Sequence, residues 1–151
     1  MPKLEGRATA IIEAPIDRCY EVAADPENAG TWQTEIKKSE VLERDDQGQQ
    51  TLVHNEVDGR IKTLKSTLRF TYDAPTGLQW KQEKGDVSGL DGSWVFKDLG
   101  DGRTEATCQM VIDLGRVLGM AARGPVGDVM RKQLIETMPE KLKKYVEANP
   151  A

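Results

Sequence analysis

Alternation of apolar and polar side chains over residues 60–72 restricts the fold of this chain more than any other feature. One face of an extended segment would carry Leu64, Ser66, Leu68, Phe70 and Tyr72. The positions between them hold threonine, lysine and arginine. A period of two with this contrast is typical of an antiparallel strand with one face in the core and the other in water. The segment predicts a sheet with an apolar face that another element covers.

Further segments with strand character follow one another through turn signals. Asp58-Gly59 and Gly100-Asp101-Gly102 have the composition of tight hairpins, and Pro75-Thr76-Gly77 is a third turn signal. The glycine-rich stretch 85–92 is expected to form a loop. Seven strands are predicted, at residues 3–13, 36–44, 50–57, 60–72, 78–80, 93–99 and 103–114.

Helices are predicted at three places. Pro15 stands where a helix begins, and Asp25-Pro26-Glu27 combines an acidic N-cap with a proline at the first helical position. A helix of about 20 residues or more is expected over 125–148, because apolar side chains recur there at helical spacing. This stripe consists of Met130, Leu134, Met138, Leu142 and Tyr145. Pro139 removes the donor for the carbonyl of Ile135, which predicts a kink.

The order of these elements predicts an α+β fold in a single domain of 151 residues. One strand, two short helices, six strands and one long helix follow one another, and hairpin connections exclude a doubly wound parallel sheet. Only one long helix is available to cover the apolar face of the sheet. The sheet is therefore expected to curl around that helix, with the glycines between positions 115 and 127 forming a loose crossing.

Composition and charge exclude several classes of function. Lys and Arg number 21 and Asp and Glu 25, so the formal net charge of −4 argues against a nucleic-acid binder that relies on a basic surface. No apolar run approaches the ~20 residues of a membrane-spanning helix. A secretory signal has an apolar stretch after its first residues, and no such stretch follows Met1 to Glu5. A cytoplasmic protein without integral membrane association is expected.

The cysteines and the histidine do not form a recognisable metal or catalytic motif. Cys19 and Cys108 lie far apart in different predicted elements, which favours buried free thiols in a reducing cytoplasm over a disulfide, although the disulfide stays open. His54 is the only histidine and is expected on the surface of a strand. A histidine-rich zinc site and a phosphate-binding glycine loop are both absent from the sequence, so no metal and no cofactor are expected.

Four short motifs follow one another before the terminal helix. They are Ile12-Glu13-Ala14-Pro15-Ile16, Asp25-Pro26-Glu27 followed by Trp32, Gly92-Ser93-Trp94-Val95-Phe96, and Gly100-Asp101-Gly102-Arg103-Thr104. Over residues 4–146 this arrangement resembles the START and birch-pollen-allergen-like superfamily, the SRPBCC proteins, and within it the polyketide cyclase/dehydrase and coenzyme Q-binding START-like branch. The resemblance implies a helix-grip fold with a ligand tunnel between sheet and helix. Its mouth would lie around residues 85–92 and the segment before the last helix.

The inward parities of the predicted strands, together with the apolar stripe of the last helix, suggest a lining for such a tunnel. Small residues such as Ser66, Ala106 and Cys108 leave space that the aromatic side chains do not fill, although the aromatic residues alternatively pack a solid core. Tyr72, Ser66 and Asn55 are polar groups that would orient a ligand. The candidate ligand-binding residues are Trp32, Leu68, Phe70, Tyr72, Trp80, Leu90, Trp94, Phe96, Met110, Met130 and Leu134.

Three functions compete on this basis. The first is binding or carriage of a small hydrophobic ligand of an aromatic, polyketide, lipid or isoprenoid-quinone-like kind. The second is a cyclase or dehydratase of the polyketide type, for which Tyr72 and Asp98 are weak catalytic candidates because both share the inward parity. The third is a regulatory module with a protein partner that docks on Lys141, Lys143 and Lys144. The glutamates on the same helix favour the alternative, in which these lysines belong to a solvated face of mixed charge.

Overall fold

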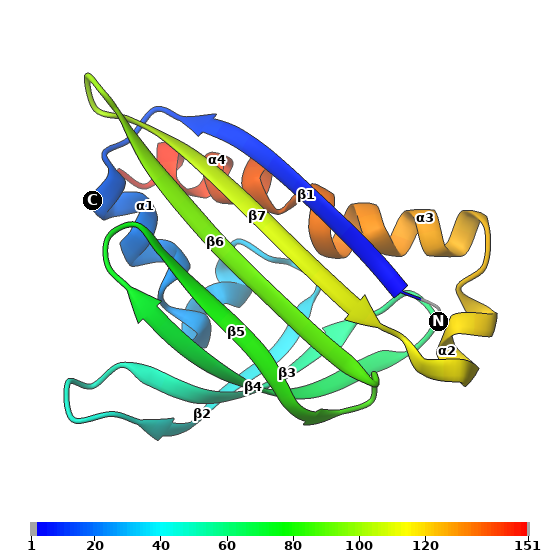
Figure 1. Cartoon of the computed structure of the whole chain (residues 1–151). Helices are drawn as coiled ribbons and strands as arrows, with labels where there is room; N and C mark the ends of the chain where they lie inside the picture. Colours follow the sequence, from blue (N-terminus) through cyan, green and yellow to red (C-terminus); the bar gives the residue numbers. More distant parts are fainter. Residues whose placement is uncertain (1–2, 151) are drawn as a thin grey trace.

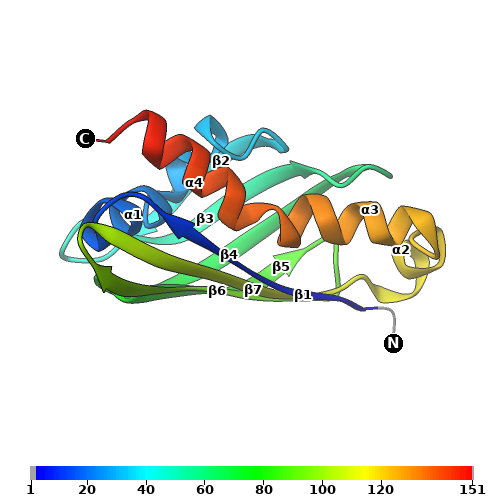
Figure 2. The same cartoon turned by 90° about the horizontal axis from the view of Figure 1, so that it is seen from above.

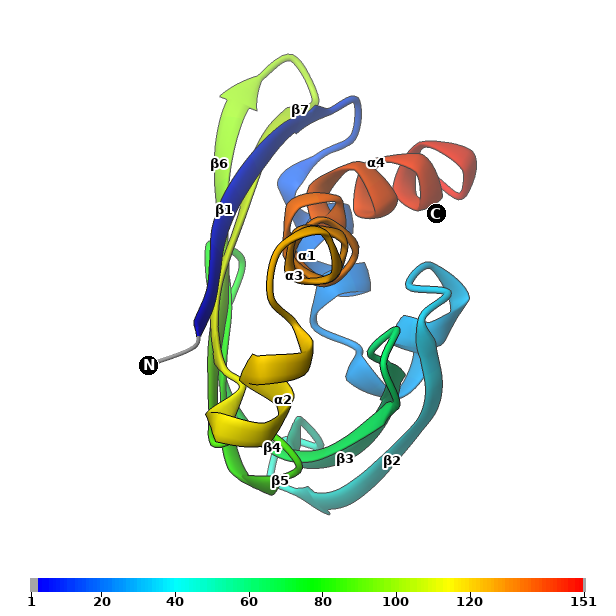
Figure 3. The ribbon, with the colours of Figure 1, turned by 90° about the vertical axis from the view of Figure 1, so that its right-hand side faces the viewer.

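A curled antiparallel sheet wrapped around a C-terminal helical rod forms the structure of this chain, a computed structural model that describes residues 3–150 (Figures 1 and 3). The seven strands lie in the order β1-β7-β6-β5-β4-β3-β2. Their bounds are β1 (Lys3–Ile12), β2 (Ile36–Arg44), β3 (Gln50–Asp58), β4 (Thr63–Asp73), β5 (Gly77–Gly85), β6 (Gly89–Gly100) and β7 (Arg103–Asp113). The helical segments are α1 (Ile16–Ala23), η1 (Pro26–Thr31), α2 (Gly115–Ala121), α3 (Pro125–Arg131), η2 (Lys132–Glu136) and α4 (Met138–Ala148). This arrangement confirms the predicted α+β helix-grip class. Met1 and Pro2 belong to the N-terminal segment for which no secretory signal is predicted, and they lie outside the described residues.

The alternation in β4 produces the two-faced strand that the sequence predicts. Ser66, Leu68 and Phe70 are buried, whereas Lys65 and Thr71 are exposed. Thr67 is the exception on the outer face, because the imidazole of His54 lies beside its hydroxyl, with Nδ1 and Oγ1 3.4 Å apart. One face of the sheet is therefore apolar along its whole centre, and all helical segments lie on that side (Figure 2).

The curl of the sheet is concentrated where the strand register is irregular. The β2–β3 pairing contains shifts between Ile36 and Lys38 and again near Glu43, and the β4–β5 pairing shifts between Thr67 and Leu68. Such irregularities bend a strand and increase its twist. The pairing of β5 with β6 ends at Lys81 and Asp91, so the two strands separate beyond that point. Bending at one side and separation at the other make a deep trough (Figure 3).

The predicted terminal helix is interrupted before Pro139 rather than simply kinked there. α3 leads into one π-helical turn, in which the amide of Thr137 donates to the carbonyl of Lys132 at 3.0 Å. Pro139 then occupies the first turn of α4, where its missing N–H costs no hydrogen bond. A π-helical turn inserts one extra residue, which leaves the carbonyl of Gln133 free for a side-chain donor.

Other segments also differ from the prediction in type or length. Residues 115–121, expected as a loose crossing, form α2, because Leu118 packs against the core and Ala122 is buried beside it. Burial of an apolar side chain thus outweighs the low helix propensity of the glycines. The loop expected at residues 85–92 shortens to three residues, since β6 begins at Gly89. The helix after Asp25 is a 3₁₀ segment rather than an α-helix.

Position 92 in β6 requires glycine, because a side chain there would collide with Trp80. The two residues are direct neighbours across β5 and β6, and a Cβ atom on Gly92 would overlap the indole ring of Trp80. The ring therefore lies flat over the backbone of β6. Gly89, in the same strand, has only the Cβ of Asp113 nearby, at 3.8 Å.

We expect Gly92→Ala to lower the free energy of unfolding by about 1–3 kcal/mol, because the Trp80 ring has to leave its position. Gly89→Ala is the matched control and is expected to change the free energy by less than about 0.5 kcal/mol. Urea denaturation followed by tryptophan fluorescence measures both. Equal destabilisation by the two substitutions would show that the close approach of Trp80 to Gly92 has no energetic consequence.

Both cysteines are free thiols in the core, which confirms the preferred alternative. Cys19 lies on α1 and Cys108 on β7, and neither side chain is accessible to solvent. Burial raises the pKa of Cys108 to about 12, and it also raises the pKa of Cys19. The reactive thiolate form of Cys108 is therefore nearly absent at neutral pH.

Cys108 is expected to react with a thiol-specific reagent at pH 8 about a thousandfold more slowly in the folded protein than in the unfolded chain, because thiolate is the attacking species. Titration with Ellman's reagent before and after addition of guanidinium chloride measures the difference, and Cys108→Ala assigns the signal. Rapid reaction of Cys108 in the native protein would contradict the burial of this thiol.

Candidate ligand cavity

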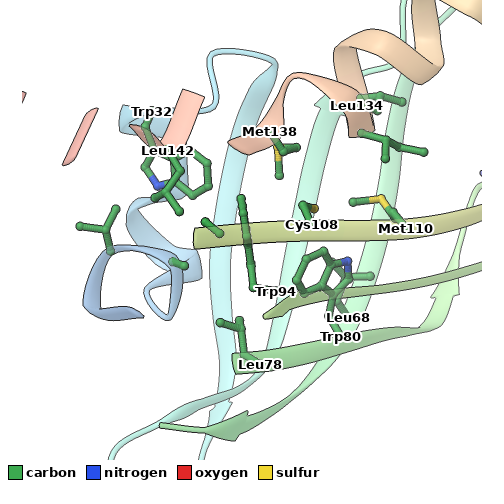
Figure 4. Packing of buried hydrophobic residues seen from close by; sticks show 14 of the residues in the cluster. Trp32, Leu68, Leu78, Trp80, Trp94, Cys108, Met110, Leu134, Met138 and Leu142 are labelled. Carbon is green, nitrogen blue, oxygen red and sulfur yellow. The ribbon is translucent and has the colours of Figure 1, made fainter. Parts of the chain in front are cut away.

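The trough of the sheet is not filled by the helices that cover it. A cavity of about 130 Å³ lies between the inner face of β3–β7 and the C-terminal rod. Trp80, Trp94 and Met110 form part of its sheet side, while Leu134 and Met138 face them from the helices (Figure 4). An apolar cavity of about 150 Å³ in another protein remains dry and binds benzene, so this volume is of ligand size.

The structure places seven of the eleven predicted lining residues on the cavity wall. These are Leu68, Phe70, Trp80, Leu90, Trp94, Met110 and Leu134. Trp32, Phe96 and Met130 are buried on the expected face but lie behind the wall. Period and parity identify the face of a strand or helix, and they do not distinguish a side chain in contact with a cavity from one packed one layer deeper.

Trp94 is held in place by a chain of aromatic contacts. Its ring stacks on Phe96 at 5.6 Å and lies 6.2 Å from Trp32, and Tyr20 meets Phe96 edge-on at 6.5 Å. Aromatic pairs in these geometries each contribute about 0.5–1.5 kcal/mol beyond their burial. The Nε1 of Trp32 and the hydroxyl of Tyr20 are buried without a partner within residues 3–150. The aromatic contacts restrict the positions that the Trp94 ring can occupy.

Tyr72 does not line the cavity and has no hydroxyl available for proton transfer. Its hydroxyl donates to the backbone carbonyl of Gln50 at 2.6 Å, and its ring stacks on Phe70. Burial raises the pKa of Tyr72 far above its ordinary value, so the hydroxyl stays protonated. Tyr72, predicted as a lining residue and as a weak catalytic candidate, thus lies outside the cavity wall.

Asp98 lies outside the cavity as well. It is exposed near the end of β6, where its carboxylate accepts the N–H of Gly100 at 2.9 Å. The strand continues past the edge of the trough, so the shared parity with Trp94 and Phe96 no longer places a side chain inside it. His54 is on the outer face, with Nε2 3.1 Å from a carboxylate oxygen of Glu56, and this contact lowers the pKa of Glu56.

The polar part of the wall includes a residue that the sequence analysis did not identify. Glu35 is 7% exposed and lines the cavity, in the segment between η1 and β2. The ammonium group of Lys141 donates to its Oε2 at 3.0 Å and to the carbonyl of Gln133 at 2.9 Å. No periodic pattern covers this segment, so the sequence offered no signal for Glu35.

Two neighbouring polar groups, both expected to orient a ligand, do line the cavity. Asn55 accepts a hydrogen bond from the hydroxyl of Ser39 at 2.7 Å, and Ser66 donates to Oε1 of Gln82 at 2.7 Å. Both lie on the same side of the cavity as Val57 and Leu64, on β3 and β4. The cavity is thus apolar with one polar side.

The three lysines considered as a docking patch have different surroundings. Lys141 is engaged by Glu35, and Lys143 is bound by Glu147 at 2.6 Å and by the carbonyl of Ile11 at 2.8 Å. Lys144 is exposed. These surroundings agree with the mixed, solvated face that the sequence favours.

Metal sites and membrane-spanning helices are both absent from the described part of the chain. Within residues 3–150 no group of three or more His, Cys, Asp or Glu side chains is placed to hold a metal ion. Among the helices of these residues, none has both the length and the hydrophobicity that crossing a bilayer requires.

Known structures share this architecture over nearly the whole chain. A START superfamily protein from Mycobacterium smegmatis is 17% identical, covers 95% of this chain and 97% of its own, and superposes with a TM-score of 0.82. A protein from Thermus thermophilus is 22% identical over 97% and 99% of the two chains, also with a TM-score of 0.82. An aromatase/cyclase from a Streptomyces species is 21% identical over 99% and 96%, with a TM-score of 0.74. At these identities the likeness concerns the fold.

Sequence comparison assigns the family. No protein of curated function matches the chain. The family described as polyketide cyclase / dehydrase and lipid transport, however, matches residues 12–138, from the end of β1 to the start of α4. The chain belongs to this polyketide cyclase / dehydrase and lipid transport family.

Proposed function

We propose that this protein binds a small, mainly apolar molecule in the cavity between its sheet and its C-terminal helices. The observation that carries the proposal is an unfilled apolar space of about 130 Å³ with one polar side, lined by buried core residues. Protein interiors normally leave few voids larger than a water molecule, so a space of this size has a cost unless a ligand occupies it. Membership of a family described by cyclisation, dehydration and lipid transport supports this reading.

The shape of the wall indicates the chemistry of the ligand. Trp80 and Trp94 offer flat aromatic surfaces, which favours a ring or another planar group. Glu35, Asn55 and Ser66 on the polar side favour a hydroxyl, carbonyl or similar group at one end. At its present volume the cavity accommodates about one six-membered ring. Rotation of Met110 and Met138, whose side chains are unbranched, would extend it for longer ligands.

Single-ring phenols are the first probes for this cavity. At about 100 times its dissociation constant, such a probe is expected to raise the melting temperature by about 5–10 °C, because binding to the folded state alone adds ~2.7 kcal/mol. Val57→Phe fills the β3 side of the cavity and is expected to abolish the shift. Thermal denaturation monitored by circular dichroism, with and without phenol or p-cresol, measures it.

Val95→Phe is the matched control, since Val95 is 57% exposed on the outer face of β6. This variant is expected to keep the full shift in melting temperature. The proposal fails if no phenol, short alkyl-benzene or quinone stabilises the wild-type protein at saturation, or if the two phenylalanine variants respond alike.

A cyclase or dehydratase is the second candidate function, and the position of Glu35 favours it. Aldol ring closure of a poly-β-ketone chain requires a base that takes a proton from a carbon between two carbonyl groups. The Glu35 carboxylate lies on the cavity wall and accepts a hydrogen bond from the ammonium of Lys141, which also donates to the carbonyl of Gln133. The similar structures include an aromatase/cyclase and two di-domain ARO/CYC proteins. In this role Glu35 replaces Tyr72 and Asp98 as the candidate base.

Under this alternative, Glu35→Gln is expected to lower the rate of ring closure of a synthetic poly-β-ketone thioester by about 100-fold or more, with binding of the substrate retained. Absorbance of the aromatic product measures turnover, and the phenol shift in melting temperature measures binding. Glu43→Gln is the control, because Glu43 is exposed and pairs with Arg69 on the outer face. Absence of turnover in the wild-type protein, or equal turnover in both variants, excludes Glu35 as a base.

A further inference from the structure

Exposed apolar side chains are concentrated at one corner of the molecule. Within residues 3–150, eight large hydrophobic side chains are markedly exposed, and four of them lie on α2 and α3. These four are Val117 (79% exposed), Met120 (62%), Val126 (40%) and Val129 (42%). We call these two helices and their connection the α2–α3 corner. Exposed apolar side chains that cluster on one face mark an interaction surface, whereas scattered ones need no explanation.

The α2–α3 corner is also locally basic, in a protein that is acidic overall. Residues 115–132 contain four arginine and lysine residues and one aspartate, a net charge of +3 in a chain of −4. Arg131 pairs with Asp128 at 3.1 Å. Arg116, Arg123 and Lys132 have no carboxylate within ion-pair distance in the described part of the chain. Apolar side chains and uncompensated cationic groups therefore share this surface.

The turn between β3 and β4 repeats this combination at the same end of the molecule. Arg60 and Lys62 flank Ile61, which is 39% exposed. Figures 1 and 3 show this turn at the end of the molecule where α2 and α3 meet. The side-chain amide of Gln133, in η2, donates to the carbonyl of Asp58 at 3.3 Å and ties the turn to the helical rod.

The cavity extends toward this end. Val57 and Leu64 flank the β3–β4 turn, and Val87 lies in the turn between β5 and β6. Together with Ile112, near the end of β7, and Leu134, just after α3, they form the cavity wall on this side. The basic and apolar surface thus surrounds the end of the molecule nearest to this part of the wall.

We propose that the α2–α3 corner, with the β3–β4 turn, binds the surface of an anionic lipid membrane. Apolar side chains of this size insert at the boundary between headgroups and acyl chains, and arginine and lysine side chains contact the phosphates around them. The combination of exposed apolar side chains and uncompensated cationic groups is complementary to an anionic bilayer. Delivery of a lipid-soluble ligand into the cavity from that surface rests on the proposed function; membrane binding itself does not.

Co-sedimentation with phosphatidylglycerol-containing and pure phosphatidylcholine vesicles tests this proposal. The wild-type protein is expected to bind the anionic vesicles and to release them when salt rises from about 0.1 M to about 1 M, because the Debye length shortens. Neutralising Arg123 by Arg123→Gln is expected to weaken binding about fivefold. Val117→Glu together with Met120→Glu is expected to weaken it by roughly tenfold or more, since both side chains lose their apolar contact.

Leu42→Glu together with Val95→Glu is the matched control. It adds the same charge at side chains that are 47% and 57% exposed on β2 and β6, away from the corner. Vesicle binding is expected to remain within about threefold of the wild-type value, since only overall charge changes. Failure of the wild-type protein to bind anionic vesicles, or equal losses in both double variants, overturns the proposal. A dimer that the Val117→Glu and Met120→Glu variant abolishes, with no vesicle binding, would make the corner a protein interface instead.

The phenol shift in melting temperature separates this inference from the proposed function. The corner variants are expected to keep the full shift, because none of their substituted residues lines the cavity. Vesicle binding without any phenol shift in the wild-type protein would remove the proposed ligand and leave the membrane surface. A phenol shift without vesicle binding would remove the proposed membrane surface and leave the ligand cavity.

Discussion

Contact between β1 and the π-helical turn determines where free space remains in this fold. A side chain on Gly6 would approach the Cγ2 of Ile135 to 2.8 Å, so the helical rod lies almost directly on the backbone of β1. Ile135, Met130 and Leu142 are fully buried. The rod is therefore seated at the β1–β7 side of the trough, and Leu134 and Met138 face the open side. A glycine in β1 and an off-centre helix together produce the cavity.

The far side of the cavity is closed by a polar contact that depends on the same helical turn. The π-helical hydrogen bond of Thr137 to Lys132 leaves the carbonyl of Gln133 for the ammonium of Lys141, which also binds Glu35. A buried carboxylate of this kind is tolerated because its charge is paired and hydrogen-bonded. Pro139 thus has a structural role beyond a bend, since it fixes the position at which the rod changes its hydrogen-bonding pattern.

The sequence predicts the fold of this chain far better than it predicts which side chains contact the cavity. Seven strands, their antiparallel order and the inward face of β4 follow from a period of two and from turn residues, both of which are local properties. Tyr72 and Asp98 share the inward parity, yet one hydroxyl is bound to the backbone of Gln50 and one carboxylate lies past the edge of the trough. Glu35 comes from an irregular segment without periodicity. Contacts across the trough are tertiary, and no single-strand pattern encodes them.

The side chains that line the cavity differ in how far they can move to admit a larger ligand. This difference connects the site with the α2–α3 corner. Trp94 is fixed by its stack with Phe96 and its contact with Trp32, and Trp80 by its contact with the backbone of Gly92. These contacts hold the aromatic part of the sheet side in place, and a ligand larger than the present volume would gain room by movement of Met110 and of the helical side. Leu134 and Met138 belong to the rod that continues from α3. The elements that would have to shift for a larger ligand are thus continuous with those that carry the exposed apolar and basic surface.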